Sequence, residues 1–147
     1  MFFSKSFGYA LRGVLYVAAM DAGQKRIVSL DEMAGTLKVP KYFLGKIMHK
    51  IVKAQVLDSS KGQHGGFSIN QQTLATPLLK LFEITEGEHL FTACALKMRD
   101  CNSEQPCPLH SKVQALRNNF QTIFSTNRVK DLLTENKDEL IQGLSAF

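Results

Sequence analysis

The chain of 147 residues lacks the features of a membrane or secreted protein. No apolar run reaches the roughly 18 residues that a membrane-spanning helix needs. The first seven residues, MFFSKSF, mix polar and apolar side chains and so lack the layout of a signal peptide. We therefore expect a cytoplasmic protein with no membrane partner.

Signatures of catalysis are also missing. The sequence has no Gly-rich phosphate loop, no nucleophile–base motif and no convincing carboxylate pair. It has only three cysteines, all within residues 94–107, and an odd number does not suit a secreted disulfide framework. In a reducing compartment such a group more often binds a metal or senses redox state. We expect a protein that is not an enzyme and has no small-molecule substrate.

Positive charge is concentrated in the first half of the chain. The net charge is +5, but residues 1–66 hold 10 basic and 4 acidic side chains, whereas residues 67–147 hold 8 and 9. A basic half beside a near-neutral half indicates one part that binds a polyanion and one part with another role.

Residues 36–53 carry the most informative pattern. Apolar residues recur at the spacing of one helix face, at Leu44, Ile47, Met48 and Ile51. Polar and cationic residues recur on the opposite face, at Tyr42, Lys46, His49 and Lys53. Such a helix can bury one face and offer donors and cations to DNA, although an ordinary amphipathic helix with a solvated basic face has the same pattern.

The neighbouring segments favour the DNA-binding alternative. A first helix is predicted over residues 6–22, ending at Gly23. Ser29 and Glu32 form a capping box that starts a short second helix, and Pro40 suits the first turn of the third. The order is that of a helix-turn-helix.

A hairpin is predicted next, over residues 56–70, because glycines separate two short segments able to pair as strands. In this position a hairpin is a wing, with Lys61, Gln63 and His64 at its tip. The fold class is therefore mainly α with a small β-hairpin wing, a winged helix-turn-helix over residues 1–72 followed by a long dimerisation helix.

Residues 73–147 are predicted to contain a linker helix from Thr76–Pro77 to Gly87, a cysteine-rich loop over residues 90–107 and a dimerisation helix over residues 108–126. Apolar residues of that last helix are spaced 4, 3, 4 and 3, at Leu109, Val113, Leu116, Phe120 and Ile123. A heptad seam usually packs helix against helix. We expect a homodimer interface, although so short a seam also suits packing within a monomer.

The cysteine spacing suits a metal centre. Cys94 and Cys101 are separated by six residues, Cys101 and Cys107 by five, and His110 follows Cys107 by one helical turn. Thiolates and an imidazole bind transition metals, and these gaps are wider than the knuckles of structural zinc sites. Such wide gaps are typical of a loop that holds an iron–sulfur cluster. The alternatives for the same three cysteines are free thiols or a reversible disulfide pair.

The order of these features resembles the Rrf2 family of bacterial winged-helix regulators. The resemblance is carried by SFGYALR at residues 6–12, the capped helix after Ser29, the helix at residues 42–53, HGGF at residues 64–67 and CPLH at residues 107–110. It covers about residues 4–133. The family includes an iron–sulfur cluster regulator and a nitric-oxide-sensitive repressor.

The resemblance implies a homodimer whose long helices cross and an iron–sulfur cluster, expected as 2Fe–2S, on Cys94, Cys101, Cys107 and His110. The nitric-oxide branch can use an Asp of the partner's first helix as fourth ligand. Gly8 stands at that position here, which favours His110. The first cysteine gap is one residue longer than in well-known members, and the loop has no glycine.

The expected function is a transcription regulator, a repressor at some promoters, that binds a pseudo-palindromic double-stranded DNA operator with an affinity set by the cluster. The DNA-binding residues are expected to be Lys5, Arg12, Ser29, Lys41, Tyr42, Lys46, His49, Lys50, Lys61, Gln63 and His64. Two alternatives remain: a cluster-free thiol regulator of the same fold, and a zinc-stapled module that binds an enzyme of sulfur metabolism.

Overall fold

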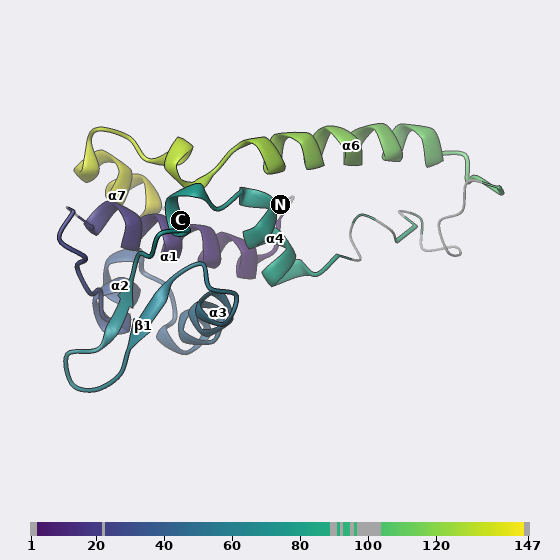
Figure 1. The fold of residues 1–147 in the computed structure, drawn as a ribbon. Helices are drawn as coiled ribbons and strands as arrows, with labels where there is room; N and C mark the ends of the chain where they lie inside the picture. Colours follow the sequence, from purple (N-terminus) through teal and green to yellow (C-terminus); the bar gives the residue numbers. More distant parts are fainter. Residues whose placement is uncertain are drawn as a thin grey trace.

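In the computed structural model, helices pack around one apolar core, and a hairpin extends from it (Figure 1). The structure describes residues 3–21, 23–88, 91, 93, 94, 96 and 104–145. The helices are α1 (Lys5–Met20), α2 (Leu30–Leu37), α3 (Lys41–Lys53), α4 (Leu78–Glu86), α6 (His110–Thr126) and α7 (Lys137–Ser145). The strands β1 (Asp58–Ser60) and β2 (Gly66–Ser68) form the hairpin, and η1 (Thr73–Ala75) and η2 (Val129–Leu132) are short 3-10 turns.

Helix α1 is the centre of the core and contacts α2, α3, α4 and α7. It begins where the Ser4 hydroxyl accepts a hydrogen bond from the backbone N–H of Phe7, at 3.2 Å. It ends at Met20, two residues before the end predicted from the sequence, and Asp21 caps it. Most residues from Ala10 onward are buried, so α1 serves as the platform on which the other helices pack.

The second helix starts as predicted, because the Ser29 hydroxyl accepts a hydrogen bond from the N–H of Glu32, at 3.1 Å. In a capping box the Glu32 side chain would also accept a hydrogen bond from the backbone N–H of Ser29, but here it bonds other groups. The Glu32 carboxylate accepts from the Tyr16 hydroxyl at 3.0 Å and from the Arg26 guanidinium at 2.8 Å. Glu32 therefore ties α2 to α1, and burial of the phenol raises the pKa of Tyr16.

The turn between α2 and α3 uses a left-handed residue. Lys38 has φ of 53°, which reverses the chain before Pro40 starts α3. The predicted core face of α3 is buried, with Leu44, Met48 and Ile51 at 0% exposure. A Cβ atom placed on Gly13 would lie 2.6 Å from the Met48 sulfur, so the glycine leaves room for the Met48 side chain between α1 and α3.

The predicted wing is present as a two-stranded antiparallel hairpin. Asp58 pairs with Ser68 and Ser60 with Gly66, and the intervening turn has Gly62 at φ of 100°. Val28, just before α2, pairs with Phe67 through two backbone hydrogen bonds of 2.8 Å. The hairpin is therefore held directly against the helix-turn-helix.

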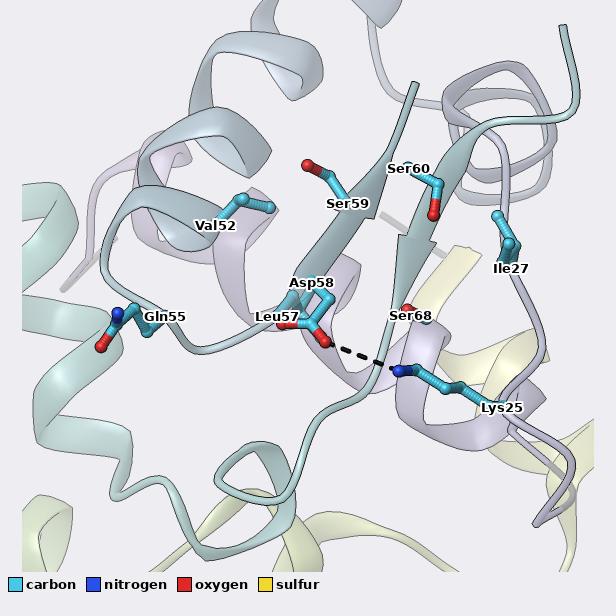
Figure 2. A pocket seen from close by; sticks show the side chains of 9 residues that line it. All are labelled: Lys25, Ile27, Val52, Gln55, Leu57, Asp58, Ser59, Ser60 and Ser68. Carbon is cyan, nitrogen blue, oxygen red and sulfur yellow. Dashed lines mark ion pairs between the residues drawn. The ribbon is translucent and has the colours of Figure 1, made fainter. Parts of the chain in front are cut away.

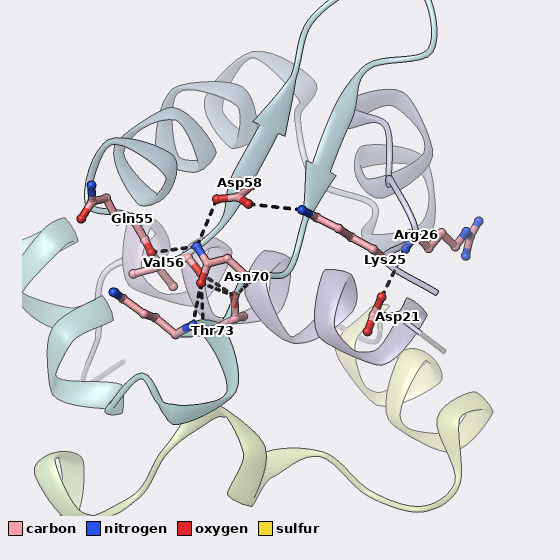
Figure 3. A network of polar contacts seen from close by, with 9 residues as sticks. Asp21, Lys25, Arg26, Gln55, Val56, Asp58, Asn70 and Thr73 are labelled. Carbon is pink, nitrogen blue, oxygen red and sulfur yellow. Dashed lines mark hydrogen bonds and ion pairs between the residues drawn. The ribbon is translucent and has the colours of Figure 1, made fainter. Parts of the chain in front are cut away.

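A polar network fixes the root of the hairpin (Figure 3). The Asn70 amide donates to the carbonyl of Gln55 at 3.0 Å and to the Asp58 carboxylate at 3.2 Å. The Thr73 hydroxyl donates to the carbonyl of Val56 at 2.6 Å. Figure 2 shows the hollow beside β1, where Lys25 of the α1–α2 connector pairs with Asp58 at 3.8 Å. These bonds orient the wing relative to the end of α3.

Six phenylalanines join α1, α4 and α6; we call them the phenylalanine cluster. Its members are Phe3, Phe7, Phe82, Phe91, Phe120 and Phe124. Phe82 is 1% exposed and touches the other five rings at centroid distances between 5.2 and 6.2 Å. Phe120 stacks on Phe124 at 4.1 Å. The cluster fixes one end of α6 to the core.

The C-terminal segment returns to the core. Backbone bonds of 3.0 Å join Leu78 to the carbonyl of Asn127 and Val129 to that of Thr76. The Thr76 hydroxyl donates to the carbonyl of Gln72 at 2.8 Å and makes no cap to α4, which begins at Leu78. After Asn127 the chain forms the short turn η2. The last described residues form α7, which the sequence did not predict and which packs on α1 and α2 with Leu144 buried. The predicted fold class, mainly α with a hairpin wing, is confirmed.

We expect Phe82→Ala to lower the free energy of unfolding by about 3–5 kcal/mol, because it leaves a cavity among five other rings. The matched control is Phe43→Ala on α3, since Phe43 is 57% exposed. That control should change stability by no more than about 0.5 kcal/mol. Urea unfolding followed by circular dichroism measures both, and equal losses would contradict the packing described for the cluster.

Candidate functional site

The outer face of α3, formed by Lys41, Tyr42, Lys46, His49, Lys50 and Lys53, is exposed to solvent. The sequence of α3 contains no acidic residue, so this face is uniformly cationic or neutral. The Lys46 ammonium lies 4.4 Å from the centre of the Tyr42 ring, which holds the lysine by a cation–π contact. The face therefore presents positive charge and hydrogen-bond donors on a rigid helix.

An aromatic pair stands at the start of this face. Tyr42 is 67% exposed and meets Phe43 edge to face at 5.7 Å. Phe43 was not among the predicted binding residues. The sequence held a signal for it, because Phe43 is apolar but falls outside the spacing of the buried residues Leu44, Ile47 and Met48.

Lys41 lies on the predicted surface but is paired within the chain. Its ammonium lies 2.5 Å from the carboxylate of Asp31 on α2. Both side chains are more than half exposed, so water and salt screen the pair, and Lys41 remains available to an anion. The pair also connects the first turns of the two helices of the helix-turn-helix.

The predicted wing residues Lys61, Gln63 and His64 are exposed at the tip of the hairpin, and Lys5 is exposed at the start of α1. Ser29 is half-buried, with its hydroxyl used as the cap of α2. The hairpin and the outer face of α3 belong to one unit, because the hairpin pairs with Val28. Together they form a basic surface that suits a polyanion.

Arg12 is also expected to bind DNA, and the structure places it on α1. It is only 9% exposed, and its guanidinium carbon lies 5.5 Å from the centre of the Tyr9 ring. Burial lowers the pKa of the Arg12 guanidinium. The residue sits on the packed side of α1, where contact with an external phosphate would need the side chain to move.

The described part of the cysteine loop contains Cys94, Cys107 and the start of α6. Cys94 is buried and Cys107 is half-buried. His110 is the first residue of α6, and its backbone N–H donates to the carbonyl of Cys107 at 2.9 Å. Cys101 lies outside the described residues. Cys107 precedes α6 and His110 begins it, and this backbone hydrogen bond joins the two residues.

The segment around Cys94 is attached to the middle of α6. The Arg117 guanidinium donates to the carbonyl of Ala93, and Phe91 belongs to the phenylalanine cluster. Among the described residues, no three Cys, His, Asp or Glu side chains are grouped closely enough to hold a metal ion. The chemistry of the predicted donors, thiolates and an imidazole, fits an iron–sulfur cluster.

Helix α6 presents an apolar stripe. It extends beyond the other helices (Figure 1), and none of its residues, all of them described, is buried. Leu109, Leu116 and Ile123 are 40%, 61% and 48% exposed, and Val113 is half-buried. Phe120, the remaining seam residue, contacts rings of its own chain in the phenylalanine cluster. The seam is therefore open to a second helix along three of its five positions.

No helix in the described ranges is long and apolar enough to span a bilayer.

Comparison with known proteins gives one family. The model of the Rrf2 family, described as an iron-dependent transcriptional regulator, matches residues 3–135. A protein named as an HTH-type transcriptional regulator of Aquifex aeolicus (strain VF5) is 31% identical over 135 residues, which cover 90% of this chain and 92% of that protein.

Solved structures have the same fold. CymR (YrzC), the global cysteine regulator of B. subtilis, superposes with a TM-score of 0.73 at 16% identity, over 90% of this chain and 95% of that one. IscR of T. potens superposes with a TM-score of 0.69 at 14% identity, over 90% and 85% of the two chains. With a family model that matches residues 3–135 and a relative that is 31% identical over 90% of this chain, the protein belongs to the Rrf2 family of transcriptional regulators.

Proposed function

We propose that this regulator binds operator DNA as a homodimer, and that an iron–sulfur cluster in the loop between α4 and α6 sets its affinity. Residues 1–72 would read the DNA, and residues 73–147 would supply the cluster loop and the dimer contact. The observation that carries the proposal is the rigid, acid-free outer face of α3, presented beside a basic wing.

The outer face of α3 suits the major groove of DNA. An α-helix fits that groove, and Lys46 and His49 on this face can reach base edges or phosphates. The wing tip, with Lys61 and His64, can reach the neighbouring backbone or minor groove. Lys5, at the exposed start of α1, can add a phosphate contact. Each phosphate contact adds affinity that falls as salt rises.

A second copy of the chain is the expected partner of α6. Leu109, Leu116 and Ile123 form an apolar stripe on a helix that extends away from its own core. Covering such a stripe with the same stripe of another copy satisfies two-fold symmetry. Two α3 helices would then face two half-sites of a pseudo-palindromic operator.

The cluster would be held by Cys94, Cys101, Cys107 and His110, in the 2Fe–2S form. When bound, it supplies a centre that oxidants, nitric oxide or iron scarcity can alter or remove. Arg117 and Phe91 attach the Cys94 segment to α6 and to the phenylalanine cluster. Binding of a cluster by this loop would bias the position of α6 and hence the spacing of the two α3 helices. The coupling between cluster and DNA would be about 1–3 kcal/mol, as in other allosteric proteins.

A cluster-free thiol regulator is the second candidate. One observation favours it: the contact of Arg117 with Ala93 places the residue before Cys94 at the middle of α6, whereas Cys107 precedes α6 and His110 begins it. In this alternative, oxidation of the cysteines would change the loop without iron.

Lys46→Ala should weaken binding to a duplex that the wild-type chain enriches from a random library, by about 1–3 kcal/mol, because it removes a cation from the outer face of α3. Fluorescence anisotropy at fixed salt measures the affinity. Lys130→Ala, on the exposed turn η2, is the matched control and should leave the affinity unchanged. Equal affinities of wild type and Lys46→Ala would mean that α3 does not read the DNA.

Leu116→Glu should convert the dimer to a monomer, because a carboxylate cannot be buried in an apolar interface without a partner. Gln121→Glu adds the same charge on another face of α6 and should remain dimeric. Sedimentation equilibrium at micromolar concentration distinguishes the two. A monomeric wild-type chain would contradict the proposed interface.

His110→Ala should shorten the lifetime of the cluster in air without unfolding the domain, because it removes one ligand from an exposed helix end. The chain is purified without oxygen, and its visible absorbance, iron and acid-labile sulfide are followed. His49→Ala, on the outer face of α3, should leave the absorbance unchanged. An unchanged lifetime would exclude His110 as a ligand. A wild-type chain that contains no iron when purified from iron-replete cells would favour the thiol regulator. A wild-type chain that contains zinc would favour a structural zinc site.

A further inference from the structure

The outer side of α3 contains a hollow where the start of α2 meets the helix. Leu30, Tyr42 and Gly45 line it, and Lys46, His49 and Lys50 stand around them. Its surface is almost wholly carbon, contributed by the leucine, the aromatic ring and the aliphatic parts of the lysines. An apolar hollow within the most cationic surface of the chain is not explained by binding to phosphates alone.

Gly45 creates the hollow. A Cβ atom on residue 45 would lie 3.0 Å from the Cδ2 atom of Leu30, closer than ordinary van der Waals contact. Leu30 is itself half-buried and packs against the core, so the floor of the hollow is held in place. Tyr42 forms one wall, and its contact with Lys46 keeps that lysine at the edge. The shape therefore depends on an absent side chain at the centre of α3.

We propose that this hollow receives the C5-methyl group of a thymine in the operator. The inference rests on the proposed DNA binding and names one base feature that α3 reads. In the major groove, the thymine methyl is the one apolar group among base edges that otherwise offer donors and acceptors. An apolar side chain of a protein partner would also fill the hollow. The lysines around it, on an α3 without acidic residues, favour a polyanion instead.

The role of each group follows from this geometry. Leu30 and the Tyr42 ring supply the apolar contact, and Lys46 and Lys50 can hold the phosphates on either side. Gly45 allows the base edge to approach the helix backbone. Specificity at this position then comes from the fit of one methyl group, while the hydrogen-bonding groups of α3 remain free to read neighbouring bases.

The test uses the full-length chain and the duplex that it enriches from a random library. Each thymine is replaced in turn by uracil, which removes only the methyl group. We expect one position per half-site at which wild type loses affinity about fourfold, the value of one buried carbon. At that position, a cytosine and a 5-methylcytosine are also compared. The methylated base should bind more tightly by a similar factor, which separates the methyl group from the rest of thymine.

Gly45→Ala is expected to abolish the difference between thymine and uracil at that position, because the added methyl group occupies the hollow. The variant should fold, since the Leu30 Cδ2 atom, 3.0 Å from the added carbon, has to give by only a few tenths of an ångström. Gly143→Ala on α7 makes the same change where no atom lies within 4 Å, and it should retain the difference. Thermal unfolding by circular dichroism checks that both variants are folded.

Two results would overturn the inference while DNA binding by α3 stands. One is equal affinity of wild type for thymine and uracil at every position of the enriched duplex. The other is a thymine preference that Gly45→Ala leaves intact, which would place the methyl contact elsewhere. If the chain enriches no duplex at all, the proposed function fails together with this inference.

Discussion

The burial of one face of α3 against α1 is the contact on which the rest of the molecule depends. Leu44, Met48 and Ile51 are fully buried, and the Met48 sulfur lies 2.6 Å from where a Cβ atom on residue 13 would stand, so the glycine leaves room for it. This contact fixes the rotation of α3 about its own axis. The opposite face is therefore held outward, with Tyr42 and the lysines exposed and no acidic residue among them. The cap of α2 and the pairing of the hairpin with Val28 complete the same unit.

A second set of contacts connects this unit to the rest of the chain. The phenylalanine cluster joins α1 and α4 to the last turns of α6, and Phe82 lies at its centre. The rings that α6 contributes to the cluster, Phe120 and Phe124, come from its second half, whereas His110 begins the helix at its other end. In the proposed mechanism, changes at the cysteine loop and at the dimer seam would act at the His110 end, and the phenylalanine cluster would transmit them to α1.

The described residues next to Cys94 contact the core and α6. Phe91 packs on Phe82 and Phe120, and the carbonyl of Ala93 accepts a hydrogen bond from Arg117. Both residues precede Cys94 by three positions or fewer. In the proposed mechanism, a change in the bonding of Cys94 would reach α4 and α6 through these contacts, and α1 would pass it on to α3.

The sequence by itself determined the elements with strong local signals: the capped helix after Ser29, the two faces of α3, the glycine-containing wing and the seam of α6. Each depends on spacing or turn chemistry over a few residues, which tertiary contacts did not override. Other features needed contacts between distant segments. Glu32 bonds Tyr16 and Arg26 in place of its own helix end, Arg12 is buried, and Phe120 packs within the chain. The hollow at Gly45 likewise exists only because Leu30, fifteen positions earlier, lies against α3. Local spacing shows which face of a helix is apolar, whereas only the packed structure decides what that face meets.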